Sequence, residues 1–328
     1  MRTDQNLKQL VNPQVRDLAW VIQSPVLINP AYPEHQLAPN SDTTNTEGLV
    51  IDDCWCEQQF LRHREWIGAL DANPQPLLDW LTPRYNPRLG YYFESLVEFW
   101  LRHTKASESV VAHLAVRNEQ RTVGEFDFLW LDSARQIIRH WEVAVKFYVH
   151  YQKGDGRVLW YGPNPQDRLD IKLQRLLGHQ LLLSQRSEAQ AALRQAGLLL
   201  PVVPSLFLKG YLFYPSHSHW REPPQDSALS PNHLRGWWTY LDVFDIPNAH
   251  EDRRWLFLPR LRWLAPAICA EPEQALMSFN ELHSFCLDLL RRKQRPPLIA
   301  EMCFRNSYWQ EVSRGFVLPQ HWPQLEKQ

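Results

Sequence analysis

Three consecutive extended segments that follow an apolar helix constrain the fold of this chain most. Residues 110–117, 121–131 and 137–149 alternate or run apolar and are rich in β-branched and aromatic side chains, which predicts three strands. Asp132–Ser133 supplies a turn between the last two, so these strands are expected to be antiparallel. Apolar residues recur at helical spacing over residues 88–103, which predicts a helix just before the strands.

The pattern continues with a second helix and another strand. Residues 167–195 have helical apolar periodicity, and residues 206–214 (LFLKGYLFY) form a short apolar strand candidate. A further helix is expected at 273–292. The sequence therefore predicts an α/β fold with a mixed sheet flanked by helices, whose core runs helix, three mostly antiparallel strands, helix, further strand.

The chain divides into three parts. Residues 1–80 are expected to form an N-terminal helical cap, with helices near 14–23 and 57–70. Residues 81–215 form the predicted core, and residues 216–328 a C-terminal extension. Two aromatic-rich segments of the extension are strand candidates, and they either lengthen the first sheet or build a second domain.

Composition limits the possible settings and partners. Hydrophobic residues make up 44% and charged residues 22% of the chain, as in a folded globular protein. No apolar run approaches the roughly 18 residues of a membrane span, and the five scattered cysteines do not suggest a disulfide framework, so a cytoplasmic protein without a membrane partner is expected. A net charge of -1 excludes a protein that coats nucleic acid through bulk positive charge.

Ionisable side chains interrupt two of the apolar strands. Asp127 and Glu142 lie on neighbouring strand candidates, and the strand period of two directs Glu142 and Lys146 to one face. Mg²⁺ (or Mn²⁺) is held by one or two carboxylates plus waters and substrate phosphates, so Asp127 and Glu142 are candidate metal ligands. Lys146 would stabilise negative charge or orient the attacking water. A cross-strand ion pair without catalysis is the alternative interpretation.

These residues resemble a known nuclease pattern. GEFDFLWLD followed by HWEVAVKFY is similar to the "GE-hydrophobic-D … E-x-K" signature of the PD-(D/E)XK, or restriction-endonuclease-like, superfamily. The resemblance implies hydrolysis of phosphodiester bonds in nucleic acid. It also implies a glutamate on the preceding helix, which matches Glu94 as a third metal ligand. A glutamine on the following helix matches Gln180, with Lys172 one helical stripe earlier.

Several longer motifs point to one family within this class. VRDLAWVIQSP, RLGYYFESLVEFW, GEFDF, HWEVAVKFY and GPNPQDRLDIKL together resemble the bacterial family called domain of unknown function 1853, over about residues 8–185. That resemblance implies a bacterial cytoplasmic protein with a restriction-endonuclease-like core. It implies no particular substrate.

The spacing before the lysine departs from the superfamily pattern. Ala144 occupies the position of the usual acidic residue, so Glu142 and Lys146 would lie roughly 13 Å apart along an ideal strand, against roughly 7 Å for the usual spacing. A β-bulge would shorten this distance. Otherwise the metal would depend on Asp127 with Glu94 or Glu125, or the chain would be a catalytically inactive nuclease-fold module that binds nucleic acid or a protein partner.

Overall fold

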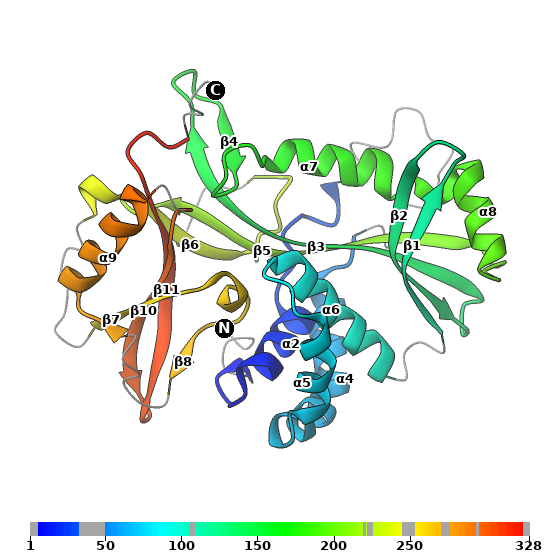
Figure 1. Ribbon diagram of the computed structural model, residues 1–328, viewed down its shortest axis with the longest axis horizontal. Helices are drawn as coiled ribbons and strands as arrows, with labels where there is room; N and C mark the ends of the chain where they lie inside the picture. The colour runs from blue at the N-terminus through cyan, green and yellow to red at the C-terminus, as the bar shows by residue number, and fades with distance from the viewer. Residues whose placement is uncertain are drawn as a thin grey trace.

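A computed structural model describes most of the chain, namely residues 6–32, 50–104, 109–218, 221, 226–244, 253–269, 276–292 and 295–323. Its dominant feature is one 11-stranded mixed sheet, with strand order β1-β2-β3-β5-β6-β11-β10-β7-β9, β4 pairing with β3, and β8 with β11 (Figure 1). The described residues also contain seven α-helices. The α/β class predicted from the sequence is therefore confirmed.

The central strands agree with the predicted order. They are β1 (Val110–Arg117), β2 (Thr122–Asp132), β3 (Ile137–Gln152), β4 (Val158–Tyr161) and β5 (Val202–Pro215). The β1–β2 and β2–β3 pairs are antiparallel, as predicted, whereas β3 and β5 pair in parallel from Ile138↔Val202 to Val149↔Phe213. A parallel pair needs a crossover connection, and the helical segment between these strands supplies it.

Helices cover both faces of the central strands. On one side lie α2 (Pro13–Gln23), α4 (Asp53–Ala72), α5 (Gln75–Leu81) and α6 (Leu89–His103), and α7 (Leu169–Arg175) lies on the other (Figure 1). The first group contains the helices predicted near 14–23 and 57–70 and, as α6, the helix predicted just before the strands. The alternation of β5 explains both layers, because Phe207 and Phe213 pack with the first group while Leu208 and Leu212 pack with α7.

The predicted helix over 167–195 is interrupted. After α7 the chain makes a π-helical turn, η2 (Leu176–Gln180), then a 3₁₀ turn, η3 (Leu183–Gln185), and a separate helix, α8 (Ser187–Gln195). Apolar side chains of α8 and η3 pack on β1, β2 and the first residues of β3 and β5, whereas those of α7 pack on the middle of β5. Helical periodicity in the sequence does not distinguish a continuous helix from two helices that pack on different strands.

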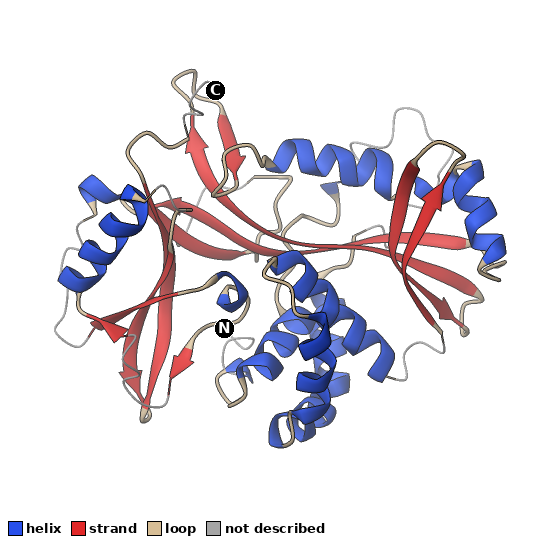
Figure 2. Cartoon of the chain, in the orientation of Figure 1, coloured by secondary structure: helices blue, strands red, loops and turns tan. Residues whose placement is uncertain are grey.

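The C-terminal extension lengthens the same sheet. Its strands are β6 (Leu234–Tyr240), β7 (Arg253–Phe257), β8 (Ile268–Cys269), β9 (Leu276–Met277), β10 (Leu298–Arg305) and β11 (Tyr308–Leu318), with the short turns η4 (Leu241–Val243) and η5 (Arg260–Arg262). The predicted last helix is α9 (Phe279–Arg291), which begins at a capping box of Ser278 and Glu281. Figure 2 shows that the outer strands at each end of the sheet run across the direction of β3 and β5.

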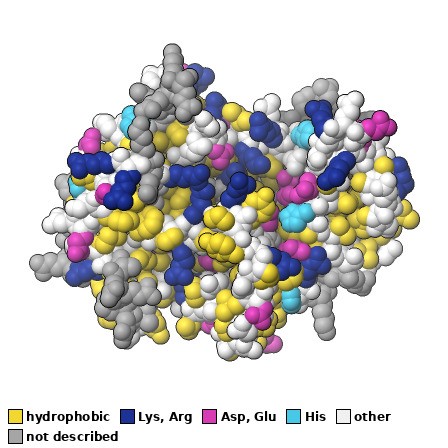
Figure 3. Space-filling view, in the orientation of Figure 1, with side chains coloured by type: hydrophobic (Ala, Val, Ile, Leu, Met, Phe, Trp, Pro, Cys, Tyr) yellow, Lys and Arg dark blue, Asp and Glu magenta, His cyan; other side chains and the backbone are white. Residues whose placement is uncertain are grey.

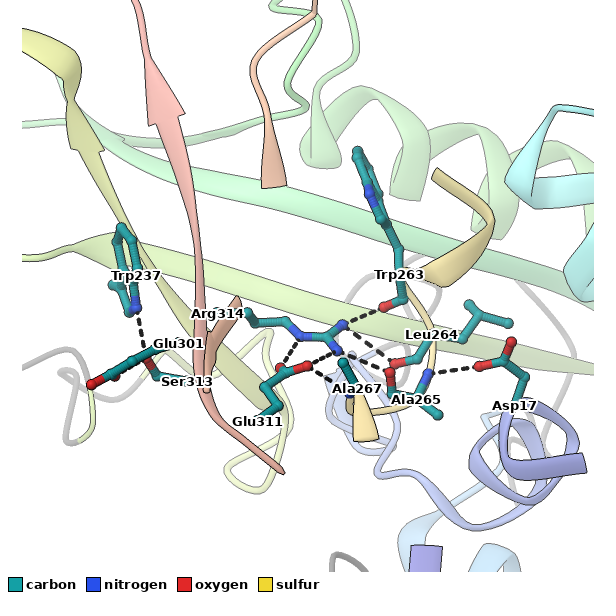
Figure 4. Close-up of polar contacts among 10 residues, drawn as sticks. All are labelled: Asp17, Trp237, Trp263, Leu264, Ala265, Ala267, Glu301, Glu311, Ser313 and Arg314. Carbon is teal, nitrogen blue, oxygen red and sulfur yellow. Dashed lines mark hydrogen bonds and ion pairs between the residues drawn. The ribbon is translucent and has the colours of Figure 1, made fainter. Parts of the chain in front are cut away.

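Hydrogen bonds around a buried ion pair join the extension to the helical cap (Figure 4). Arg314 on β11 is 1% exposed, and its guanidinium donates to Glu311 Oε2 at 2.8 Å and to the carbonyl oxygen of Ala265 at 3.0 Å. The amide of Ala265 in turn donates to Asp17 Oδ1 on α2 at 3.0 Å. The segment after η5 is thereby held between α2 and β11, the last strand of the chain.

Candidate active site

The candidate site lies where β2 and β3 separate. Their last pair in this direction is Phe128↔Trp141, and beyond it the backbone amide of Val143 donates to Asp127 Oδ2 at 2.9 Å. The pairing of β3 with β4 starts only at Val149↔Tyr161. A stretch of this β3 edge therefore has no strand partner among the described residues, and the Asp127 carboxylate takes the place of a strand carbonyl.

β1 is distorted opposite the same aspartate. Ala112 and Leu114 pair with Phe128 and Phe126, but His113 between them has a φ of 55°, in the left-handed region that side chains other than glycine rarely adopt. The His113 ring contacts Glu125 Oε1 through Nδ1 at 3.3 Å. Strained backbone of this kind is concentrated at functional sites, so its position next to Asp127 supports a site here.

Three carboxyl groups come together at this fork. Asp127 on β2 lies close enough to Glu142 on β3 and to Glu94 on α6 for its charge to raise the pKa of both. Burial is the main cause that raises the pKa of Glu142 to about 8, of Glu94 to about 7 and of Asp127 to about 6. All three pKa values lie well above those of exposed carboxyls, a feature that is concentrated in functional sites.

The predicted glutamine is part of this cluster. Gln180, the last residue of the π-helical turn η2, donates from Nε2 to Glu142 Oε1 at 3.2 Å. Isolated π-turns occur frequently at functional sites, and this one presents an amide to a buried carboxyl. Gln180 therefore fixes the orientation of Glu142, whose side chain is only 6% exposed.

The two lysines occupy different places in the site. Lys146 Nζ lies 3.3 Å from Asp167 Oδ2, and the Tyr148 hydroxyl also donates to Asp167. The amine that was predicted to be catalytic is therefore paired with a carboxylate. The β3–β5 register continues without a bulge through these residues, and the extra spacing between Glu142 and Lys146 is therefore kept. Lys172 on α7 is the amine whose positive charge lowers the pKa of all three carboxyls.

His140 is a member of the site that the sequence interpretation missed. It is fully buried beside Glu142, and its Nε2 lies 3.9 Å from Glu142 Oε2. Both ring nitrogens of His140 and this oxygen of Glu142 lack a hydrogen-bond partner among the described residues. Burial lowers the pKa of His140 to about 4, so the ring is neutral. Its position two residues before Glu142 on the same strand was the available signal, because the period of two places both on one face.

Asp127 and Glu142 are oxygen ligands of the kind that hard divalent cations prefer, and the described residues contain no larger set of protein ligands around them. No group of three or more His, Cys, Asp or Glu side chains in the described part of the chain is arranged to hold a metal ion. Mg²⁺ needs only one or two protein carboxylates because waters and substrate phosphates complete its shell. Asp127 and Glu142 are such a pair, and the positive charge of Lys172 offsets only part of the rise in their pKa values that burial causes.

Substitution of Glu142 tests whether burial raises the pKa of its carboxyl. In metal-free buffer, Glu142→Gln is expected to be roughly 2–4 kcal/mol more stable than the parent protein at pH 9, and nearly equal to it at pH 5. The folded pKa of about 8 is above the usual value of 4.5, so the folded protein holds a proton that the unfolded chain releases, and stability falls as pH rises between these values. Urea unfolding at both pH values measures the difference. An equal difference at pH 5 and pH 9 would show that Glu142 is not titrating in this way.

The fold and the site define a mixed α/β protein with a buried carboxyl cluster at a strand fork. The chain matches the model of the family described as Domain of unknown function (DUF1853) over residues 16–318, and it belongs to this family. The family predicted from five sequence motifs is thus confirmed, and the match extends through the C-terminal extension. No curated protein and no solved structure matches the chain. Within the described residues, every helix is too short or too polar to cross a membrane.

Proposed function

We propose that this protein is a metal-dependent nuclease of the PD-(D/E)XK type that hydrolyses phosphodiester bonds in nucleic acid. The observation that carries the proposal is the cluster of Glu94, Asp127 and Glu142, contributed by the helix and the two strands that the superfamily resemblance implies. Their order along the chain and their mutual electrostatic effect both support a shared site. The proposal includes a bacterial cytoplasmic setting, in accord with five cysteines that are all free.

Each residue of the site has a distinct proposed role in the reaction. Asp127 and Glu142 would hold Mg²⁺ or Mn²⁺. Glu94, which does not complete a three-ligand group with them, would be the group that accepts a proton from water. The cation would supply charge stabilisation for the phosphoryl oxygens and a more acidic bound water. Gln180 holds Glu142 in place through its hydrogen bond of 3.2 Å. Lys172 would stabilise the negative charge that develops on the phosphate.

The surface around the cluster supports binding of a polyanion. On the face shown in Figure 3, a group of Lys and Arg side chains gathers at the centre, next to a group of Asp and Glu side chains with a His between them. This acidic group lies beside the β1–β2 hairpin and below α7 in the orientation of Figure 1. A local basic area of this kind would bind phosphates although the whole chain has a net charge of -1.

The test is cleavage of a mixed panel of single-stranded, double-stranded and branched DNA and RNA, with Mg²⁺, with Mn²⁺ and with a chelator. The proposal expects cleavage of at least one substrate with a divalent cation and none with the chelator. Binding of a panel member without cleavage under any metal condition would instead support the inactive nuclease-fold module. Absence of both binding and cleavage would overturn the assignment to nucleic acid.

The two lysines provide a sharper expectation within the same assay. Lys172→Ala is expected to lower the cleavage rate about 100-fold, the usual effect of removing one donor to a developing oxyanion, and Lys146→Ala to lower it less. The reason is that Lys146 is paired with Asp167, whereas Lys172 acts electrostatically on the carboxyls. Arg175→Ala, an exposed cation on the same helix, is the matched control. A larger loss for Lys146→Ala would assign the catalytic amine to β3 instead.

A further inference from the structure

A second concave site lies on the helical side of the protein, formed by different residues from the carboxyl cluster. It is a cavity of about 390 Å³ between α2, the α5–η1 segment with the loop after it, α6 and η5. This volume is within the usual range of small-molecule sites. Its walls are mostly apolar and include Pro13, Leu78, Leu81 and Leu261.

The charged groups of this cavity are two arginines and one carboxylate that already accepts hydrogen bonds from within the protein. Asp17 is 5% exposed, and its oxygens accept from the Tyr92 hydroxyl at 2.9 Å and from the Ala265 amide at 3.0 Å. Arg262 is exposed and makes no hydrogen bond or ion pair with any other residue that the structure describes. The charge of Arg262 lowers the pKa of the buried Asp17 carboxyl, but Arg262 has no hydrogen-bonded anion among the described residues, so its exposed guanidinium can bind one at the rim of the cavity.

The second arginine is held in a fixed position. The Arg84 guanidinium lies 3.5 Å from the centre of the Trp80 ring, and its Nη1 donates to the Trp80 carbonyl oxygen at 3.0 Å. Stacking on an aromatic ring leaves the other guanidinium N–H groups in the plane available for an acceptor. Tyr85, which follows Arg84 and also lines the cavity, is 74% exposed, an unusual exposure for a large aromatic side chain.

We propose that this cavity binds an organic anion with an apolar or aromatic body and one carboxylate or phosphate group. The body would occupy the apolar interior, and Arg262 together with Arg84 would bind the anionic group at the rim. A ligand in this position would touch both the N-terminal helices and the C-terminal segment at η5. The proposal is independent of the nuclease assignment, because it involves none of the carboxyl cluster.

Fluorescence titration with 8-anilinonaphthalene-1-sulfonate (ANS) tests the proposal, with N-phenyl-1-naphthylamine as the matched probe that lacks the sulfonate. ANS is expected to bind at one saturable site, and Arg262→Gln to weaken it about tenfold while leaving the neutral probe unchanged. Ser95→Trp, which fills the cavity from α6, should abolish binding of both probes. Arg121→Gln, an exposed arginine on the β1–β2 turn, is the control and should change nothing.

Competition identifies the anionic group of the natural ligand class. Displacement of ANS by octanoate would assign a carboxylate, and displacement by phenyl phosphate would assign a phosphate. The proposal is overturned if ANS binding is not saturable, if neither competitor displaces it, or if Arg262→Gln and Ser95→Trp both leave it unchanged. Equal circular dichroism and melting temperature of the variants show that any loss of binding is not a loss of fold.

Discussion

Asp127→Asn is expected to lower the rate of metal-dependent phosphodiester cleavage at least about 1,000-fold. Asp127 is the carboxylate that interacts with both Glu142 and Glu94, so its loss leaves a cation without a central ligand. Metal-ion catalysis contributes several kcal/mol of transition-state stabilisation, and each 1.36 kcal/mol corresponds to a factor of ten in rate. Single-turnover kinetics at saturating Mg²⁺ on whichever panel substrate is cleaved would measure the loss.

The asparagine variant separates catalysis from folding. Its amide oxygen can still accept the hydrogen bond from Val143 N–H that the Asp127 carboxylate accepts at 2.9 Å, so the strand fork should remain intact. Asp132→Asn is the control, because Asp132 lies on the same strand but pairs with Arg139 away from the fork. Cleavage by Asp127→Asn within tenfold of the parent rate, with equal stability, would remove Asp127 from the catalytic group.

Much of the core could be predicted from the sequence because its elements are long and periodic. The helix at Leu89–His103 and the three strands after it agree with the apolar pattern to within a few residues. The period of two also placed Glu142 and Lys146 correctly on one face, since both contact the segment that packs on the α7 side of β3. Local periodicity was therefore sufficient to predict that Asp127 and Glu142 lie on neighbouring strands.

The partners of these side chains could not be predicted in the same way. The ion pair of Lys146 with Asp167 and the position of His113 opposite Asp127 depend on strand register and on the path of a connecting loop. Those features are set by long-range packing, which leaves no periodic signal in the sequence. The continuation of one sheet through β6 and β11 was equally undetermined, because a strand pattern does not reveal which strand is its neighbour.

Substitution of the buried Arg314 is expected to have the largest effect on the free energy of unfolding. Arg314→Met is expected to reduce the free energy of unfolding by about 3–5 kcal/mol, the usual cost of breaking a buried ion pair from one side. Glu311, which is 8% exposed, would keep a buried charge without its partner, and the carbonyl oxygens of Trp263, Leu264 and Ala265 would lose their donor (Figure 4). Urea unfolding followed by tryptophan fluorescence would measure this loss.

The double variant Arg314→Met/Glu311→Met shows which part of the cost comes from the unpaired charge. It is expected to be more stable than Arg314→Met alone, because it removes the uncompensated carboxylate along with the guanidinium. It should remain less stable than the parent, since the three carbonyl oxygens still lack a donor and Glu311 Oε2 no longer accepts from the Ala267 amide at 2.8 Å. If the double variant were as unstable as the single one, the carbonyl contacts rather than the ion pair would hold the C-terminal extension against α2.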